Sequence, residues 1–403
     1  MERYRMSSFL KIRELDAKTS QKIKPQYRGN SYKISSPLIK RDFLINDSIK
    51  HFLEKFQTPK SLDEVVLEFE KEFDHSSESL KNHCSGIFKI SLKKGFLIPE
   101  TKEESISSID PFFEPDDHIG DYKVISVISN KKLVDIYKVL HLPTNEIRVI
   151  KLLNGKKAAN KKSYNKELGF FRLEKSLLKK GIGISAIYQL FDYQEQEQFA
   201  YMVLELVSGV GIPRFFRKSE PLTAQQEFKL INNVLRGFRE LHKGGIIHGD
   251  VHPSNILVSE DLEVKIIDLG MSIDAANSGN EIVKVGGVLY YLPPERINSI
   301  SIDKFSYRPN FLSDVYQIGM IVYFTLYRKV PFSGFIWEEL SDQIQTKDLD
   351  FPAQTAWGRP ISTEYKNLIK NCTSKIPTQR YSTAEAIYQD FLRLTDTLNS
   401  AQK

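Results

Sequence analysis

Four polar residues in this chain have the types and the order that phosphoryl transfer requires. Lys151 ends a strand-like run that begins at Ile147, and Asp250, Asn255 and Asp268 follow it. Moving a phosphoryl group needs a cation on the phosphates, oxygen ligands for Mg²⁺ and a carboxylate beside the attacking hydroxyl. Lys151 supplies the cation, Asn255 and Asp268 the metal ligands, and Asp250 the carboxylate. We therefore expect a transferase that uses ATP and Mg²⁺, with Lys151 and Asp250 as its catalytic residues.

The spacing within the second cluster is specific. Residues 248–255 read His-Gly-Asp-Val-His-Pro-Ser-Asn, and Asp268-Leu-Gly270 follows a hydrophobic strand-like run, Val264–Ile267. The glycine after the metal carboxylate permits the turn that must follow it. His-x-Asp-x-x-x-x-Asn, then Asp-x-Gly after a strand, with a strand lysine upstream, resembles the protein kinase superfamily.

Other segments resemble the same superfamily. Tyr201–Leu206 is similar to the strand and hinge that hold adenine, with Leu204 at the gatekeeper position. Pro293-Pro-Glu295 resembles the end of an activation segment, Asp314–Gly319 resembles the anchoring helix of the large lobe, and Arg380 stands where the family places the buried partner of Glu295. The resemblance implies an ATP site formed by Ile128, Val149, Lys151, Glu167, Glu205, Val207, Asn255 and Asp268, with Mg²⁺ on the last two.

Lys151 also needs a carboxylate that aims it at the phosphates. The helical segment that follows presents Glu167, and Glu174 lies two turns further along a nearby face. We expect Glu167 to pair with Lys151, and Glu174 is the competing candidate.

The loop that should cover the phosphates lacks its glycines. The run from Ile128 to Ile136 keeps the apolar flanks of Gly-x-Gly-x-x-Gly, but Ser129, Lys131 and Val134 stand at the glycine positions. Backbone amides close less tightly over a phosphate when a side chain is present, so we expect a weak grip on ATP. Lys131 and Lys132 would offset this electrostatically.

The catalytic loop departs from the family at three further positions. Gly249 replaces the usual Arg, so switching by phosphorylation of the activation loop is not expected. His252 replaces a Lys, and Val288 stands near the position of a Thr. His-Gly-Asp-x-His-Pro-x-Asn resembles phosphotransferases of the aminoglycoside and choline type. Two alternatives to a Ser/Thr-type peptide or protein kinase therefore stay open: a pseudokinase that serves as an interaction module, and a small-molecule phosphotransferase.

The pattern of the chain predicts an α+β protein with two folded domains. Residues 1–35 are read as a basic solvated tail, 36–100 as a small domain and 101–118 as an acidic linker broken by two prolines. A two-lobed protein-kinase-like fold is expected over 119–395. Its small lobe would be the β-rich segment 119–206, and its large lobe the helical segment 207–395.

The small domain is expected to contain a strand, three helices and a closing strand, which is a winged-helix-like order. The strand would be Leu38–Leu44, and Asn46 or Asp47 would cap the first helix. Ser61 and Glu64 form a capping box for the second helix, and the third covers about Glu78–Lys94. Phe43–Asn46, Thr58-Pro59, Leu62–Val66 and Lys93–Leu97 are similar to the PqqD-like fold, which implies recognition of the leader of a ribosomally made precursor peptide.

Composition limits the remaining possibilities. Of 403 residues 41% are hydrophobic and 27% charged, and the net charge is +6, as is ordinary for a soluble protein. Cys84 and Cys372 lie too far apart for a metal motif, and the longest apolar run, Ile318–Leu326, is too short to span a bilayer. We expect a cytoplasmic protein without a membrane partner. Nucleic acid is not an expected partner, because the second and third helices of the small domain carry Glu64, Glu68, Glu70, Glu72 and Glu78.

Overall fold

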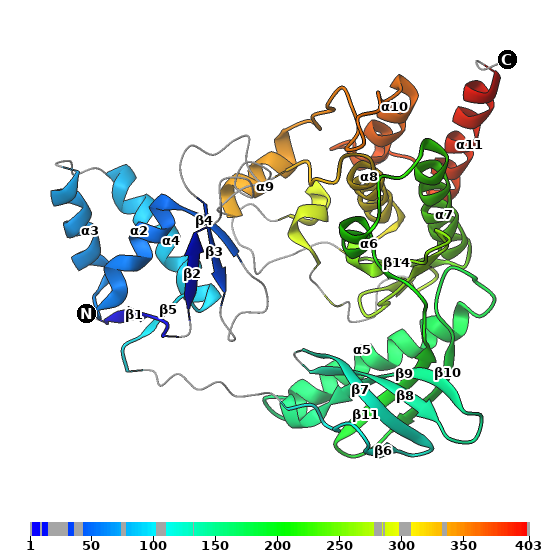
Figure 1. The fold of residues 1–403 in the computed structure, drawn as a ribbon, viewed down its shortest axis with the longest axis horizontal. Helices are drawn as coiled ribbons and strands as arrows, with labels where there is room; N and C mark the ends of the chain where they lie inside the picture. Colours follow the sequence, from blue (N-terminus) through cyan, green and yellow to red (C-terminus); the bar gives the residue numbers. More distant parts are fainter. Residues whose placement is uncertain are drawn as a thin grey trace. The chain divides into compact units, whose positions relative to one another are not determined.

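The computed structural model describes residues 2–8, 10–14, 31–35, 43–73, 78–101, 110–131, 133–277, 284, 287–297, 308–332 and 337–400. The chain divides into two compact units, Met1–Ser108 and Ile109–Lys403. Figure 1 shows the strands and helices of each unit along the chain.

Within its described residues, the first unit combines two small antiparallel sheets with the helices α2, α3 and α4. Its elements are β1 (Tyr4–Met6), β2 (Lys11–Glu14), β3 (Ser31–Ser35), β4 (Phe43–Asn46), α2 (Asp47–Glu54), η1 (Lys55–Gln57), α3 (Leu62–Glu72), α4 (Glu78–Lys94) and β5 (Leu97–Pro99). One sheet has the order β2-β3-β4, and β1 pairs with β5. Their core contains Ile34, Phe52, Phe56 and Phe69, all of which are buried.

The helix boundaries of this unit follow from local capping. The side chain of Asn46 accepts a hydrogen bond from the N–H of Ile49, and Ser61 and Glu64 satisfy each other's backbone N–H groups. Both caps and the third helix were predicted from the sequence, and the structure confirms them. The interpretation of residues 1–35 as a solvated tail is wrong, because β1, β2 and β3 pair within the sheets. Residues 38–42 of the expected first strand lie outside the described part of the chain, and the described strand begins at Phe43.

The second unit begins with a six-stranded antiparallel sheet. Its strands are β6 (His118–Ile119), β7 (Tyr122–Lys131), β8 (Val134–His141), β9 (Glu146–Asn154), β10 (Leu190–Glu195) and β11 (Phe199–Glu205), in the order β10-β11-β9-β8-β7-β6. Between β9 and β10 the chain forms η2 (Gly155–Lys157) and the long helix α5 (Lys161–Lys180), which Asn160 caps through the N–H of Ser163. We refer to this sheet and α5 as the small lobe.

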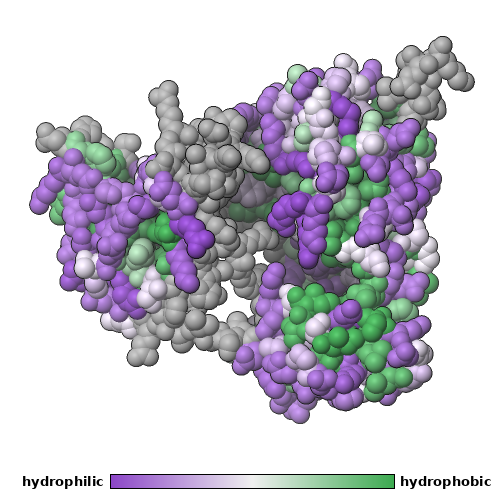
Figure 2. Space-filling view, viewed as in Figure 1, coloured by the Kyte–Doolittle hydropathy of each residue, from purple (hydrophilic) through white to green (hydrophobic). Residues whose placement is uncertain are grey.

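One face of the sheet has a hydrophobic cluster of its own. Tyr137, Val139 and Ile150 are buried in this cluster, and Phe112 and Phe113 pack against it. Residues 110–117 therefore belong to the second unit, and their interpretation as part of an extended linker is wrong. Residues 102–109 lie outside the described part of the chain. Ile125, Leu142 and Ile147 of the same lobe are exposed, and Figure 2 shows a hydrophobic area over its strands.

The rest of the second unit, the large lobe, is mainly helical. Its helices are α6 (Ile212–Lys218), α7 (Ala224–Lys243), α8 (Phe311–Tyr327), α9 (Trp337–Thr346), α10 (Thr363–Cys372) and α11 (Ala384–Ser400), with the short turns η3 (Pro253–Asn255), η4 (Leu289–Tyr291), η5 (Pro294–Arg296) and η6 (Pro377–Gln379). Two small sheets join β12 (Val210–Gly211), β14 (Ile256–Val258) and β15 (Val264–Ile266), and β13 (Ile246–Ile247) with β16 (Ile273–Asp274). Helix α8 is buried over almost its whole surface, so it forms the centre of the lobe.

The large lobe contains the expected buried ion pair. Arg380 donates from both terminal nitrogens to the carboxylate of Glu295, at 2.8 Å each. It also donates to the backbone C=O of Leu312 and Ser374. Four of the five N–H donors of the guanidinium are used in this way, and such hydrogen bonds offset the cost of burying its charge. The pairing predicted from the sequence is confirmed.

Candidate active site

A cavity of about 660 Å³ separates the sheet of the small lobe from the large lobe. Its wall includes Ile128, Val149, Lys151, Glu167, Glu205, Val207, Asn255 and Asp268, which are all the residues expected at a nucleotide site. Apolar side chains from β8, β9, α5 and β14 also line it, together with polar and charged residues that include Lys131, Glu174 and Lys284. The structure thus brings together residues that lie far apart in the sequence, on a scale that suits a small ligand.

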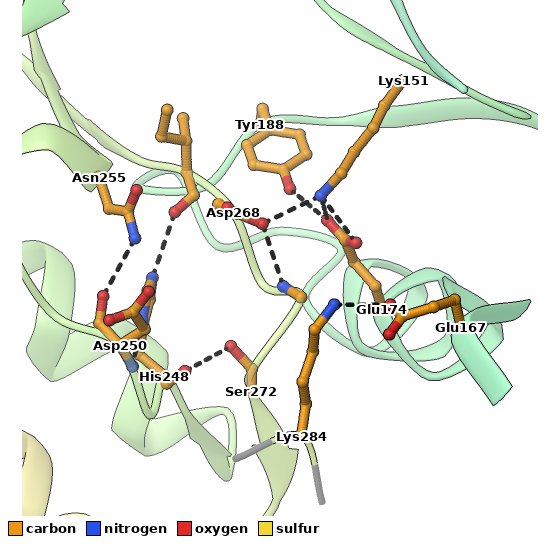
Figure 3. Close-up of polar contacts among 12 residues, drawn as sticks. Lys151, Glu167, Glu174, Tyr188, His248, Asp250, Asn255, Asp268, Ser272 and Lys284 are labelled. Atoms are coloured by element: carbon orange, nitrogen blue, oxygen red, sulfur yellow. Dashed lines mark hydrogen bonds and ion pairs between the residues drawn. The ribbon is translucent and has the colours of Figure 1, made fainter. Parts of the chain in front are cut away.

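Lys151 lies at the centre of the charged part of this cavity. It sits on β9 between Ile136 of β8 and Met202 of β11, so its backbone is fixed on both sides. Its Nζ donates to Glu174 at 2.6 and 2.8 Å and to Asp268 at 3.0 Å (Figure 3).

The partner of Lys151 is Glu174, and the expectation of Glu167 is wrong. Glu174 is buried four turns into α5, where the hydroxyl of Tyr188 also donates to it at 3.2 Å. Glu167 lies about two turns earlier. It lines the cavity but pairs with Lys284 at 2.8 Å (Figure 3). The segment between β9 and α5 determines which turn of the helix faces Lys151. Helical periodicity does not predict the length of that segment.

The charges of this cluster shift one another's pKa values. Burial alone would lower the pKa of Lys151, but Asp268 and Glu174 outweigh it and raise that pKa. The charge of Lys151 holds the pKa of Asp268 far below its ordinary value. Lys151 therefore stays a cation and Asp268 a carboxylate at neutral pH.

The loop that carries Asp250 is fastened by a buried carboxylate of α8. Asp314 accepts from the backbone N–H of His248 at 2.6 Å and of Gly249 at 2.9 Å, and His242 lies 3.2 Å away. The side chain of Asn255 donates to the C=O of Asp250 at 3.0 Å (Figure 3).

Gly249 has a geometric reason to be a glycine here. Its φ is +75°, and a Cβ at this position would lie 2.6 Å from the backbone oxygen of Met271. Arg296 donates to its C=O at 2.6 Å. A side chain such as the arginine of the family therefore does not fit this backbone.

The carboxylate of Asp250 itself is oriented by two neighbours. Its Oδ1 accepts from the N–H of Val288 at 3.3 Å, and Nε2 of His252 lies 3.7 Å from its Oδ2. Val288 thus contributes a backbone group at the position where the family has a threonine side chain.

The hairpin between β7 and β8 covers one side of the cavity. Lys131 is directly opposite Val134, and Ser129, Lys131 and Val134 all line the cavity. Lys132 lies outside the described residues. The three side chains at the glycine positions therefore face the space that a phosphate would occupy.

The end of β11 and the residues after it form the apolar edge of the cavity. The carboxylate of Glu205 accepts from Lys265 and from the N–H of Gln189, each at 3.0 Å, which fixes the end of the strand. Among the described residues, the backbone of Val207 has no hydrogen-bond partner in the chain. Its N–H and C=O are available to the edge of a planar base.

Sequence reasoning missed four residues of this site: Glu174 as the lysine partner, Tyr188, Lys284 and Arg296. Helical spacing named Glu174 only as the competing candidate, Tyr188 belongs to none of the motifs in the sequence, and Lys284 and Arg296 reach the site from the segment before α8. No spacing rule connects the last three residues with Lys151.

Comparisons with known proteins agree with this geometry. A model of the protein kinase domain matches residues 122–392. The chain is 26% identical over 278 residues to serine/threonine-protein kinase PknL of Mycobacterium tuberculosis, 30% over 216 residues to PknB of the same species, and 25% over 276 residues to PrkC of Bacillus subtilis.

These alignments cover 69%, 52% and 67% of this chain respectively. They cover 66% of PknL, 33% of PknB and 40% of PrkC, so the chain spans less than two thirds of each relative. Within the part of the chain that the structure describes, no helix is both long and apolar enough to cross a lipid bilayer.

Proposed function

The chain belongs to the protein kinase family, and on this premise we propose that it transfers the γ-phosphate of Mg-ATP to a Ser or Thr hydroxyl of a peptide or protein. The observation that carries the proposal is the arrangement around Lys151, whose ammonium group lies within 3.0 Å of both Glu174 and Asp268. Glu174 holds the lysine in place from the helix side. A phosphate oxygen approaching from the cavity would take the N–H that Asp268 now accepts, while Glu174 keeps the cation in place.

Asp268 and Asn255 have the chemistry of a Mg²⁺ site. A carboxylate and an amide are hard oxygen ligands, and Mg²⁺ is usually held by one or two protein groups together with substrate phosphates and water. The amide nitrogen of Asn255 is used by the C=O of Asp250, which leaves its oxygen for the metal. Asp268 and Asn255 would hold the ion, which would supply positive charge against the negative charge of the transferred phosphoryl group.

Asp250 would orient the acceptor hydroxyl and take its proton. Val288 fixes one carboxylate oxygen, and the other oxygen, 3.7 Å from Nε2 of His252, would meet the hydroxyl. A positioned general base typically contributes 10²- to 10⁴-fold to the rate. The adenine ring would lie against the apolar edge of the cavity, with its polar edge on the backbone of Val207.

A pseudokinase is the second candidate, and the hairpin without glycines favours it. A small-molecule phosphotransferase is supported by Gly249 and His252 alone. The test is incubation of the purified chain with labelled Mg-ATP and Ser- or Thr-containing peptides. Transfer to peptide supports the proposal. Binding without transfer supports the pseudokinase, and transfer to a small alcohol with none to peptide supports the third function.

We also propose that the first unit docks the peptide that the kinase unit modifies. The PqqD-like resemblance motivates this, and β2 and β4 at the two edges of its sheet support it, because edge strands offer backbone groups to an added strand. Tethering would raise the local concentration of the acceptor to the order of millimolar. The expected substrate is a ribosomally made precursor peptide.

Truncation tests this docking. Since residues 110–117 pack on the small lobe, the shortened chain should begin at Ile109. It should bind Mg-ATP as the full chain does and phosphorylate the precursor peptide about tenfold or more slowly. Equal rates would contradict docking. Binding of the full chain to duplex DNA, lost on truncation, would point to a nucleic-acid function for the first unit.

A further inference from the structure

The hairpin over the cavity is held from its outer side by a buried carboxylate, Asp135. This side chain is fully buried, and it follows Val134, the last of the three positions where glycine is missing. Its Oδ2 accepts from the side-chain nitrogen of Asn154 at 2.8 Å, from the N–H of Phe112 at 3.1 Å and from the hydroxyl of Tyr137 at 3.2 Å. Its Oδ1 forms an ion pair with Lys157.

Lys157 connects both strands of the hairpin. Its ammonium group contacts Asp135 on β8 and the side-chain oxygen of Asn130 on β7. It comes from η2, directly after β9, and its side chain is almost as buried as that of Asp135. The tip of the hairpin is tied to the same place, because the N–H of Asn154 donates to the C=O of Leu133 at 2.7 Å.

A buried ion pair with this many additional hydrogen-bond donors is stable only while every partner is present. Removing one partner leaves an uncompensated buried charge, which is costly. The hairpin is therefore held in one position relative to β9, the strand that carries Lys151. Glycine loops obtain their close approach to phosphate from backbone freedom. Here side-chain contacts fix the distance between the hairpin and Lys151.

We propose that Asp135 and Lys157 are positioning residues that hold the glycine-free hairpin at the distance from Lys151 at which it grips the nucleotide phosphates. This inference rests on the proposed use of Mg-ATP. Neither residue lines the cavity, so both act through the hairpin.

The test compares Asp135→Asn and Lys157→Met with the unaltered chain. We expect each variant to raise the KM for ATP about tenfold, the loss of about 1.4 kcal/mol of binding, and to change kcat at saturating ATP less than twofold. Lys157→Arg keeps the cation and should keep the KM near that of the unaltered chain. Arg359→Met is the control, because it breaks an ion pair with Glu227 that lies in the large lobe and is less buried than that of Lys157. It should lower the melting temperature and leave the KM unchanged.

The contacts of Asp135 and Lys157 with the hairpin form a clamp, and hydrogen exchange of the nucleotide-free chain tests this clamp without a measurement of enzymatic activity. Amides of residues 129–136 should exchange faster in Asp135→Asn than in the unaltered chain, and not in Arg359→Met. An unchanged KM and unchanged exchange in Asp135→Asn would overturn the inference. Faster exchange in a chain that never binds Mg-ATP would uphold the clamp and reject the proposed function instead.

Discussion

The loop that carries Asp250 and the hairpin between β7 and β8 are each organised around one buried carboxylate. They differ in how many of the residues typical of the family they keep. Asp314 accepts hydrogen bonds from the backbone N–H groups of His248 and Gly249. Asp135 accepts from Asn154 and Phe112 and forms an ion pair with Lys157. The catalytic loop keeps the residues of the family at Asp250, Asn255 and Asp268. The hairpin keeps none of the glycines.

The difference separates residues that take part in the reaction from residues that position other groups. A carboxylate that accepts a proton or binds a metal has no substitute of another residue type, because the charge itself is required. The approach of a hairpin to phosphate is a distance, and either backbone freedom or a side-chain clamp can set it. Divergence in the hairpin is therefore compatible with activity, whereas divergence at Asp250 would not be.

The largest effect should follow from Asp250→Asn. The amide cannot accept the proton of the hydroxyl, so kcat should fall about 10²- to 10⁴-fold. Affinity for Mg-ATP should stay within about twofold, since Asp250 does not line the cavity. Single-turnover transfer and equilibrium binding measure the two quantities. Asp261→Asn, at an exposed carboxylate of the same lobe, is the control. Full activity in Asp250→Asn would remove this residue from the mechanism.

A smaller but still large effect should distinguish the two glutamates of α5. Glu174→Gln removes the charge that holds Lys151 in place, and kcat/KM for ATP should fall about 100-fold, as for other misplaced catalytic groups. Glu167→Gln breaks only the half-exposed pair with Lys284, so its effect should stay within about threefold. Steady-state kinetics on both variants decide between them. The reverse ranking would restore Glu167 as the partner of Lys151.

The same two glutamates show what the sequence could and could not predict. Motif spacing led to Lys151, Asp250, Asn255 and Asp268 because these residues are held by short, fixed segments. The structure places Lys151, Asn255 and Asp268 in the wall of one cavity, and Asn255 donates to the C=O of Asp250. Capping residues predicted the ends of helices in the first unit because caps are local contacts. The choice of Glu167 failed because it depends on how α5 is rotated and shifted against β9, which is set by packing.

Longer-range pairing explains the other errors. Residues 1–35 looked like a tail because their strands are short and polar, and because β5, the partner of β1, lies far along the chain. Asp135 belongs to none of the motifs in the sequence, and nothing in the sequence connects it with Lys157 or with the N–H of Phe112. Buried networks of this kind are formed by the fold as a whole.

A more moderate effect should come from exchanging the buried carboxylates for amides. Asp314→Asn should lower kcat about tenfold with little change in the KM for ATP, because it loosens the loop beneath Asp250. Asp135→Asn should instead raise the KM for ATP and change kcat little. Steady-state kinetics at varied ATP separate the two parameters. If both variants change the same parameter, the loop and the hairpin are not independent, and the comparison between them fails.

The smallest expected effect is the most direct test of the hairpin. From the sequence alone, a glycine at 134 is expected to lower the KM for ATP by restoring the family loop. The clamp gives a reason for the opposite sign. Val134 is paired with Lys131 and Leu153 and lines the cavity, so Val134→Gly removes an apolar contact and adds backbone freedom that costs about 1 kcal/mol. We expect the KM to rise about threefold to fivefold, measured at saturating peptide, with kcat unchanged. In the Asp135→Asn background the hairpin is already loose, so the same change should have less effect. A KM that falls in both backgrounds would show that glycine freedom, and not the clamp, limits the grip on phosphate.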